Sequence, residues 1–380
     1  MQIAVIGGGI AGVSAAYALL TSERGPEAEP LDVILLEAEP VLAHHTTGRS
    51  AAQLILNYGE TSTRVLSRAS LAFLNQPPSD LVDFPLLHER AVLSLAPVEQ
   101  AAAADRLLAD GQAVNPLVRE ISVSEAESLF PPLRPEWTVR AVLEPGSYDI
   151  DVAGLHQAYV RGVRHHGGRI DVSSPVVALV RRSDRWQIEL ASGAVVSADV
   201  VVNAAGAWGD VVAARASVPP VGLQPLRRTA FMTPSRYPDS AGWPLVADID
   251  HSWYVKPDGI QFLCSPADEQ PSEPCDAKPE ELDVASAIDR INAATNLDIR
   301  HVASSWAGLR TFAPDRSMVI GPEPTEPSFF WCVGQGGTGI QTSPAAGRLT
   351  ADLVLNGEPG RLFHHNPLPL DQLLPDRFRH

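Results

Sequence analysis

The stretch "VIGGGIAGVSAAYALL", residues 5–20, places three glycines between a short apolar run and a segment of helical composition. Gly7, Gly9 and Gly12 fit the pattern G-x-G-x-x-G, which binds dinucleotides when it joins a strand to a helix. Gly7 permits a tight turn, Gly9 lets the backbone approach a pyrophosphate, and Gly12 permits close packing of helix on strand. The stretch therefore predicts a nucleotide-binding turn.

The neighbouring residues supply the structural context that this motif needs. Residues 2–6 are typical of a buried strand, 10–20 of a helix, and 31–36 of a second buried strand, with a polar surface loop expected at 21–30. Glu37 ends the second strand, where a carboxylate accepts hydrogen bonds from ribose hydroxyls. Motif and context together predict a βαβ unit but leave both NAD and FAD open.

The N-terminus of the helix that follows the turn is expected to bind the pyrophosphate. Its first residues, Ile10 and Ala11, present free backbone N–H groups. These groups and the helix dipole stabilise a negatively charged pyrophosphate.

Composition narrows the class of protein. The 380 residues carry a formal net charge of −16, which disfavours a nucleic-acid partner because no basic surplus opposes the phosphates. The three cysteines, Cys264, Cys275 and Cys332, have no metal-ligand spacing and predict no disulfide framework. We find no signal peptide and no transmembrane segment, so the expected location is the cytoplasm.

The rest of the chain alternates between strands and helices. Residues 198–208 predict a buried strand that enters a turn of small residues, and 329–355 predict strand, glycine turn and helix. Ser124 and Glu127 have the spacing of a capping box for a helix over 124–129. Further helices are expected at 63–75, 98–110, 152–166 and 279–292, a strand–turn–strand at 84–97, and an antiparallel meander at 176–181, 186–190 and 195–197.

Four separated stretches resemble one known family. They are "HHTTGRSAAQL" (44–54), "VVNAAGAW" (201–208), "SWAGLRTFAPD" (305–315) and "GQGGTGIQTSPAAG" (334–347). Their order and spacing are similar to those of the FAD-dependent D-amino-acid oxidase family, and in particular of its D-amino-acid dehydrogenases. The resemblance covers nearly the whole chain and favours FAD over NAD.

The resemblance implies a fold and a division into domains. We expect an α/β, Rossmann-like FAD-binding domain with an inserted α+β substrate domain, built on a large mixed or antiparallel sheet. The FAD-binding domain is assigned to residues 1–80, 146–220 and 303–380, and the substrate domain to 81–145 and 221–302.

The resemblance also implies a set of cofactor contacts. Thr47 and Arg49 are expected near the pyrophosphate, Ser50 and Ala51 beside the flavin N5, and the backbone of Val177 at the adenine. The second glycine turn is expected at the flavin N1–C2 edge, where a helix N-terminus favours the reduced form. The remaining implied contacts are Gly48, Ala52, Ala205, Gly206, Trp208, Arg310, Gly336, Gly337, Gly339, Ile340, Gln341 and Thr342.

The resemblance also bears on how the flavin is attached. Sarcosine oxidases hold it covalently through a cysteine near the segment equivalent to "GLR". Here Thr311, Phe312 and Ala313 follow Arg310, so the expected FAD is non-covalent.

A carboxylate-binding site is expected in the substrate domain. Arg228 and Arg310 match family carboxylate binders, and Tyr254 supplies a phenol; an arginine fork binds both carboxylate oxygens in fixed geometry. Arg227 competes with Arg228, because strand alternation turns only one of them inward. Gln53 and Tyr58 are candidates to orient the substrate amine, and no catalytic base is proposed.

The side-chain pocket is where the sequence departs from its family. The position of the glutamate that pairs the guanidinium of D-arginine in some members is occupied by Val92, and Ile55 stands at another pocket position. A buried cation without a counter-ion is costly, so these residues favour neutral, apolar D-amino acids. Glu89 remains an alternative if the loop shifts by one residue.

The predicted reaction is oxidative deamination of a D-amino acid. A hydride passes from the substrate Cα to flavin N5, and water converts the imino acid to a 2-oxo acid and ammonia. The electrons then leave to a quinone, a dye or O2. Two alternatives remain: an oxidase for a secondary amine of the glycine or sarcosine type, and a non-catalytic FAD-binding subunit. His44 and His45 lack a third ligand at suitable spacing, so no metal site is predicted.

Overall fold

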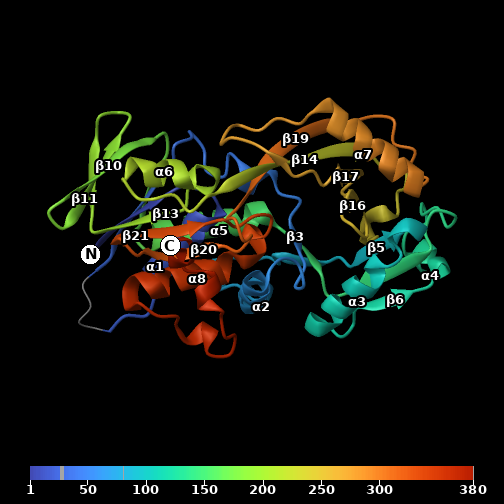
Figure 1. Ribbon diagram of the computed structural model, residues 1–380, viewed down its shortest axis with the longest axis horizontal. Helices are drawn as coiled ribbons and strands as arrows, with labels where there is room; N and C mark the ends of the chain where they lie inside the picture. The colour runs from blue at the N-terminus through green and yellow to red at the C-terminus, as the bar shows by residue number, and fades with distance from the viewer. Residues whose placement is uncertain (26–29, 80, 380) are drawn as a thin grey trace.

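The computed structural model describes residues 1–25, 30–79 and 81–379. Two halves lie side by side along the longest axis, one holding both chain termini and the other built on a broad sheet (Figure 1). Part of the loop predicted at 21–30 lies outside the described residues.

The N-terminal βαβ unit is confirmed. Strand β1 (Gln2–Ile6) leads through the glycine turn into α1 (Ile10–Leu20), and β2 (Asp32–Leu36) returns parallel to β1 with Ile6 opposite Leu36. The carboxyl ends of the parallel strands meet at one edge of the sheet, which is where such sheets bind ligands.

Six strands form the sheet of this half. Their order is β20-β21-β13-β1-β2-β9, and every neighbouring pair is parallel except β20 and β21. Distant parts of the chain therefore build one nucleotide-binding sheet. The strands not yet introduced are β9 (Arg169–Asp171), β13 (Val200–Asn203), β20 (Val319–Glu323) and β21 (Glu326–Val333).

Helices cover this sheet and bury its core. Helix α8 (Gly339–Asn356) packs against α1 so closely that a Cβ added to Gly347 would lie 2.6 Å from the carbonyl oxygen of Ser14. Helix α2 (Thr61–Asn75) packs on α8, and α5 (Val152–His165) packs on α1. Buried aliphatic residues of these helices form one core with β1 and β2.

A nine-stranded mixed sheet forms the other half. Its order is β18-β14-β17-β16-β15-β5-β7-β6, with β19 pairing β14, and only β5 and β15 run parallel. This sheet confirms the predicted fold class. Its strands are β5 (Val92–Ala96), β6 (Arg119–Ile121), β7 (Arg140–Glu144), β14 (Gln224–Pro234), β15 (Leu245–Asp248), β16 (Tyr254–Asp258), β17 (Gln261–Ser265), β18 (Gln270–Pro271) and β19 (Ser304–Phe312).

One strand differs from the predicted division into domains. Residues 303–380 are assigned to the FAD-binding domain, but β19 pairs with β14 from Gln224↔Phe312 to Met232↔Ser304 and so belongs to the large sheet. The backbone hydrogen bonds of a long antiparallel pair decide this membership. Both strands run along the top of the molecule toward the second half (Figure 1). The other boundaries of the division stay predictions.

Several local predictions are confirmed and two need correction. The meander forms as β10 (Val176–Arg182), β11 (Arg185–Leu190) and β12 (Val195–Ala198). The predicted helix at 98–110 begins as a 3-10 turn and becomes α3 (Ala103–Val114). Other elements are α6 (Gly209–Arg215), α7 (Glu281–Ala294) and a small sheet of β3 (Gln53–Leu54), β8 (Tyr148–Ile150) and β4 (Leu87–Glu89).

The predicted capping box is wrong by two residues. Helix α4 (Val123–Leu129) is capped by Ser122, whose hydroxyl accepts a hydrogen bond of 3.1 Å from the backbone N–H of Glu125. Ser122 has the extended backbone that an N-cap requires, so Ser124 and Glu127 lie inside the helix. Among the residues described, no helix combines the length and apolar character needed to cross a bilayer.

A buried carboxyl group in the large sheet gives a stability prediction. Glu144 of β7 is 7% exposed, and burial raises its pKa to about 7, although Asn57 and Arg64 act in the opposite direction. The folded chain therefore holds this proton up to about pH 7, whereas the unfolded chain releases it near its ordinary value of 4.5. The contribution of Glu144 to the free energy of unfolding is therefore fully present below pH 4.5 and is lost as the pH rises to about 7.

We expect E144Q to remove this loss, which amounts to about 3 kcal/mol between the two pH limits. Urea unfolding followed at pH 5 and pH 8 measures it: the wild type weakens over this range more than E144Q does. E136Q, which changes a carboxylate 70% exposed, is the matched control and should follow the wild type. Parallel pH dependences for E144Q and the wild type would refute the assignment.

Candidate functional site

The first glycine turn is closed by backbone contacts. Gly7 has a φ of +114°, and a Cβ added to it would lie 2.5 Å from the carbonyl oxygen of Ala204. A Cβ on Gly12 would lie 1.9 Å from the carbonyl oxygen of Gly7. The hydroxyl of Thr47 accepts a 3.0 Å hydrogen bond from the N–H of Ile10, which fixes the 3-10 turn η1 (Thr46–Arg49) at the start of α1.

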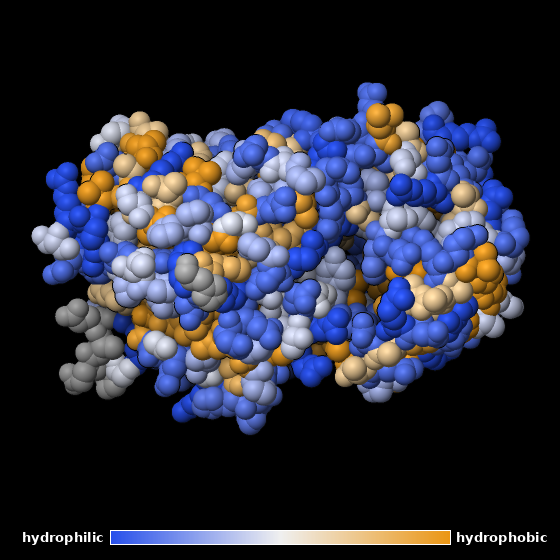
Figure 2. All heavy atoms as spheres, in the orientation of Figure 1, coloured by the Kyte–Doolittle hydropathy of each residue, from blue (hydrophilic) through white to orange (hydrophobic). Residues whose placement is uncertain are grey.

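Three connected cavities extend from this turn. We name them after the groups that the sequence analysis expects there: the nucleotide, flavin and substrate cavities, of about 240, 130 and 510 Å³. Gly9, Thr47 and Gly206 line both of the first two, while Arg228 and Arg310 line both of the last two. The molecular surface dips between the two halves (Figure 2). The chain of cavities suits an elongated dinucleotide with a small molecule at its far end.

The nucleotide cavity lies beyond the end of β2. The Glu37 carboxylate accepts hydrogen bonds from the N–H of Gly8 at 2.6 Å and of Glu39 at 2.8 Å, which holds it at the rim. The rings of Trp208 and His45 pack together in the wall of this cavity, with their centroids 4.6 Å apart. Gly7, Ala205 and Gly206 line the same cavity, as predicted.

The expected contact of the Val177 backbone with the adenine stays a prediction. Val177 is 46% exposed, and the neighbouring Val176 lines the nucleotide cavity. Successive residues of a strand point to opposite faces, so these two side chains face different ways. Ser174 and Arg215 also line this cavity, and neither belongs to a motif that the sequence analysis used.

Arg49 also has different partners from those expected near a pyrophosphate. Its guanidinium donates to the carbonyl oxygens of Ala307 at 2.8 Å and Ala277 at 3.0 Å, and it pairs with Asp276. The Arg49 carbonyl accepts a 3.0 Å hydrogen bond from the indole of Trp306. This residue therefore joins the two halves, and it lines the flavin cavity together with its neighbours Ser50 and Ala51. Its expected place near the pyrophosphate stays a prediction.

The second glycine turn brings the N-terminus of α8 to the flavin cavity. The N–H of Gly336 donates to the Thr311 carbonyl at 2.9 Å, and a Cβ on Gly337 would lie 2.7 Å from Cζ of Arg310. No side chain caps α8, so its first N–H groups remain free to face negative charge. Gly339 and Ile340 line the cavity as predicted.

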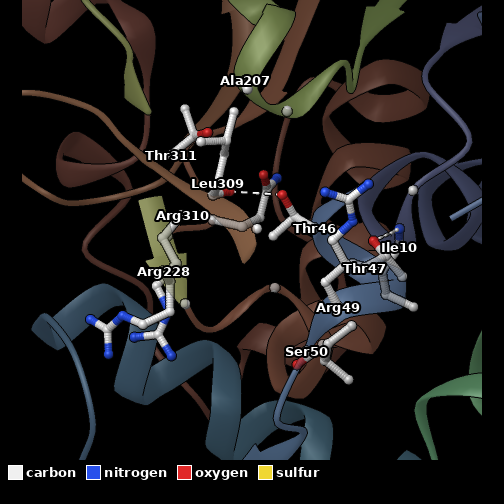
Figure 3. A pocket seen from close by; sticks show the side chains of 18 of the residues that line it. Ile10, Thr46, Thr47, Arg49, Ser50, Ala207, Arg228, Leu309, Arg310 and Thr311 are labelled. Carbon is white, nitrogen blue, oxygen red and sulfur yellow. Dashed lines mark hydrogen bonds between the residues drawn. The ribbon is translucent and has the colours of Figure 1, made fainter. Parts of the chain in front are cut away.

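Two guanidinium groups meet at the boundary of the flavin and substrate cavities. Arg228 of β14 and Arg310 of β19 extend toward the same side of the cavity (Figure 3). Burial and the neighbouring charge of Arg310 lower the pKa of Arg228. Repulsion between these cations favours an anion between them.

The competition between Arg227 and Arg228 is settled by strand alternation. Arg227 points to the other face of β14, where it pairs with Glu280 and with Asp283 at 2.7 Å. Arg228 is therefore the inward residue.

Tyrosines and an amide complete the polar wall. The Tyr58 hydroxyl accepts a hydrogen bond of 3.3 Å from Arg310, and Tyr254 lines both cavities. The Gln53 amide nitrogen donates to the Arg90 carbonyl at 3.2 Å, while its oxygen has no partner among the described residues. All the predicted substrate residues thus come together in one cavity.

An apolar wall faces these polar groups. Val92, Leu245 and Ala247 form a buried cluster, against which Ile55 and Tyr254 pack. Sequence analysis found Ile55 and Val92 but missed Leu245 and Ala247, which reach the cavity only because β15 pairs with β5. It also missed Asp250, His251 and Glu269, which belong to no motif. The counter-ion argument against cationic substrates is therefore weaker than the sequence indicates.

Some residues predicted to contact the cofactor do not line the flavin cavity. Gly48 lies where a Cβ would be 2.4 Å from the Ala43 carbonyl oxygen, and the Thr342 hydroxyl bonds to the Thr338 carbonyl. Ala52 and Gln341 line the substrate cavity rather than the flavin cavity. Gly12, Gly48, Val177 and Thr342 line none of the three cavities.

The two histidines do have a third neighbour, contrary to expectation. One ligand atom each of Glu39, His44 and His45 lies within 4.8 Å of the others, in the wall of the nucleotide cavity. Glu39 and the His45 Nε2 are hydrogen-bonded at 2.9 Å, which accounts for their approach. We assign no metal to this group.

Comparison with known proteins identifies the family to which the chain belongs. Residues 2–353 match the family described as DAO, FAD dependent oxidoreductase. The chain is 25% identical over 432 residues to FAD-dependent oxidoreductase domain-containing protein 1 of Bos taurus, covering 99% of this chain and 84% of the relative. It is 24% identical over 411 residues to mitochondrial dimethylglycine dehydrogenase of Rattus norvegicus, covering 99% of this chain but only 45% of that protein.

Solved structures share the fold. L-proline dehydrogenase from P. horikoshii gives a TM-score of 0.82 at 20% identity, with 100% of this chain and 97% of that chain covered. Glycine oxidase from Geobacillus kaustophilus gives 0.80 at 21% identity, with 93% and 94% covered. The matches confirm the family, while the expected special likeness to D-amino-acid dehydrogenases stays a prediction.

The fold and the matched residues define an FAD-dependent oxidoreductase. The chain belongs to the DAO family, and its cofactor is FAD. The cavities fit this group: glycines leave room where a Cβ would clash, and the N-termini of α1 and α8 lie at the flavin cavity. The Ile10 N–H, expected to be free, is instead bonded to the Thr47 hydroxyl, whereas no N-cap side chain bonds to the start of α8. None of the three cysteines lines the described flavin cavity, and non-covalent attachment of the flavin stays a prediction.

We expect G12A to lower the affinity for FAD by about 100-fold, because its Cβ would overlap the carbonyl oxygen of Gly7 and open the turn. The ratio of flavin to protein absorbance after gel filtration measures the loss. G242A is the control, since a Cβ there meets no described atom within 4 Å. Full flavin occupancy in G12A at low FAD would contradict the placement of the pyrophosphate at this turn.

Proposed function

We propose that this protein oxidises a D-amino acid with a neutral, apolar side chain to the imino acid, which water converts to a 2-oxo acid and ammonia. The observation that carries the proposal is the pair of guanidiniums, Arg228 and Arg310, beside an apolar wall at the flavin cavity. Preference for the D isomer rests on the resemblance in sequence.

The chain's own groups bind and orient the substrate. Arg310 and Arg228 hold the carboxylate, since guanidinium forks bind both oxygens and keep their charge. The phenols of Tyr58 and Tyr254 fix the carboxylate end, and the free amide oxygen of Gln53 suits the substrate amine.

The apolar cluster around Val92 then takes the side chain and excludes water from the reacting carbon. Bound FAD supplies the acceptor for the two electrons and the hydrogen that leave Cα. The electrons pass on to a quinone, a dye or O2.

A second candidate is a secondary amine such as an N-methyl amino acid. Dimethylglycine dehydrogenase is a relative and glycine oxidase a structural neighbour, and the substrate cavity of about 510 Å³ has room for an N-substituent. A non-catalytic FAD-binding subunit is the third reading. The retained guanidinium pair argues against it, because a scaffold has no need of two repelling cations at the flavin.

Anaerobic reduction of the flavin separates these candidates. We expect absorbance at about 450 nm, the band of oxidised flavin, to fall with D-leucine, D-methionine or D-phenylalanine and to change little with their L isomers or sarcosine. Fastest bleaching by sarcosine or dimethylglycine would favour the secondary amine. No bleaching by any of them would favour the scaffold.

We expect R310M to raise KM for the best substrate by about 100-fold, because the substrate carboxylate then has Arg228 as its one guanidinium partner in a desolvated site. Flavin content should stay near that of the wild type. R300M is the matched control, since Arg300 is 74% exposed and pairs with Asp298 at the surface. An unchanged KM in R310M would exclude this carboxylate site.

A further inference from the structure

The substrate cavity contains a carboxylate that the proposed clamp does not use. Glu269 accepts a 3.1 Å hydrogen bond from Arg228 at Oε1, and Arg316 donates to both of its oxygens at 3.1 Å. The three side chains are 13%, 33% and 45% exposed in the order Arg228, Glu269, Arg316. Glu269 therefore bridges an inner guanidinium in the cavity and an outer one at the surface.

The loop that carries Glu269 is fixed on β14 by its other residues. Asp268 accepts hydrogen bonds from the N–H of Thr229 at 2.6 Å and from its hydroxyl at 3.0 Å. The hydroxyl of Ser265 donates to the Thr229 carbonyl at 2.6 Å. With the backbone held in this way, the Glu269 side chain can change partners while the loop stays in place.

The outer guanidinium is held as well. Arg316 lies over the ring of Phe312, 3.8 Å from its centroid. A carboxylate that leaves Arg228 therefore keeps a cationic partner and does not become an unpaired charge.

The charges beside Arg228 favour the exchange of Glu269 for another anion. Among the described residues, Glu269 is the only carboxylate hydrogen-bonded to Arg228 or Arg310. The buried Nε of Arg228 has no hydrogen-bond partner among the described residues, and Glu269 accepts one hydrogen bond from this guanidinium. An anion that binds in a bidentate manner could therefore accept more hydrogen bonds from Arg228 than Glu269 does.

We propose that Glu269 is an exchangeable counter-ion that determines the selectivity of the site for carboxylates. This inference rests on the proposed function. Glu269 holds Arg228 when the cavity contains no carboxylate; the substrate carboxylate then takes Arg228, and Glu269 remains on Arg316. Each binding event has to displace Glu269, and a second carboxylate on the substrate meets its charge. The site therefore prefers amino acids with one carboxylate over dicarboxylic ones.

Binding of benzoate to the FAD-loaded protein tests the exchange, because benzoate carries a carboxylate and no amine and its binding perturbs the flavin spectrum. We expect E269Q to bind benzoate about tenfold more tightly, since the competing charge-assisted hydrogen bond is gone. We expect R316M to bind it more weakly, because Glu269 then has Arg228 alone. R316M also keeps the test decisive if E269Q folds poorly.

E280Q is the matched control. Glu280 pairs with Arg227 on the opposite face of β14, so this variant makes the same change in net charge without reaching the cavity and should bind benzoate like the wild type. Unchanged or weaker binding in E269Q would overturn the inference while leaving the carboxylate site intact. Benzoate that perturbs the flavin of neither the wild type nor any variant would contradict the proposed function itself.

Discussion

The antiparallel pairing of β14 with β19 is the constraint on which the site depends. Its register, with Leu226 opposite Arg310, brings two guanidiniums together at the cavity boundary, although 82 residues of sequence separate Arg228 from Arg310. The strand hydrogen bonds fix the backbone positions from which both side chains extend. Their repulsion is stored in the fold and is relieved by an anion, which makes carboxylate recognition a property of the sheet rather than of mobile side chains.

The half of the molecule that contains both glycine turns, the cofactor half, was the more predictable from sequence, for a physical reason. Its decisive contacts are made by the backbone, at the turn of Gly7 and at that of Gly337, where a Cβ would overlap neighbouring atoms. Such positions demand glycine and leave a visible pattern in the sequence. The buried strands and amphipathic helices around them follow from local periodicity, and their bounds agree with expectation to within a few residues.

The half built on the nine-stranded sheet, the substrate half, was less predictable from sequence because its contacts join distant strands. Leu245 reaches the cavity only through the parallel pairing of β15 with β5, and Glu269 through a loop held on β14. Neither leaves a local pattern. One feature of the cofactor half is hidden from the sequence for the same reason: Arg49 pairs with Asp276, which comes from a segment more than 220 residues away.

The pairing of Gln224 with Phe312 also has a consequence for how such a chain can diversify. Because the two ends of the segment 224–312 lie against each other, everything between them leaves the cofactor half and returns at one place. Loops within this segment can be lengthened or shortened while the β14–β19 pair, and with it the contact of Thr311 with the second glycine turn, stays in place. A lineage built this way can acquire new specificities while its redox centre stays unchanged.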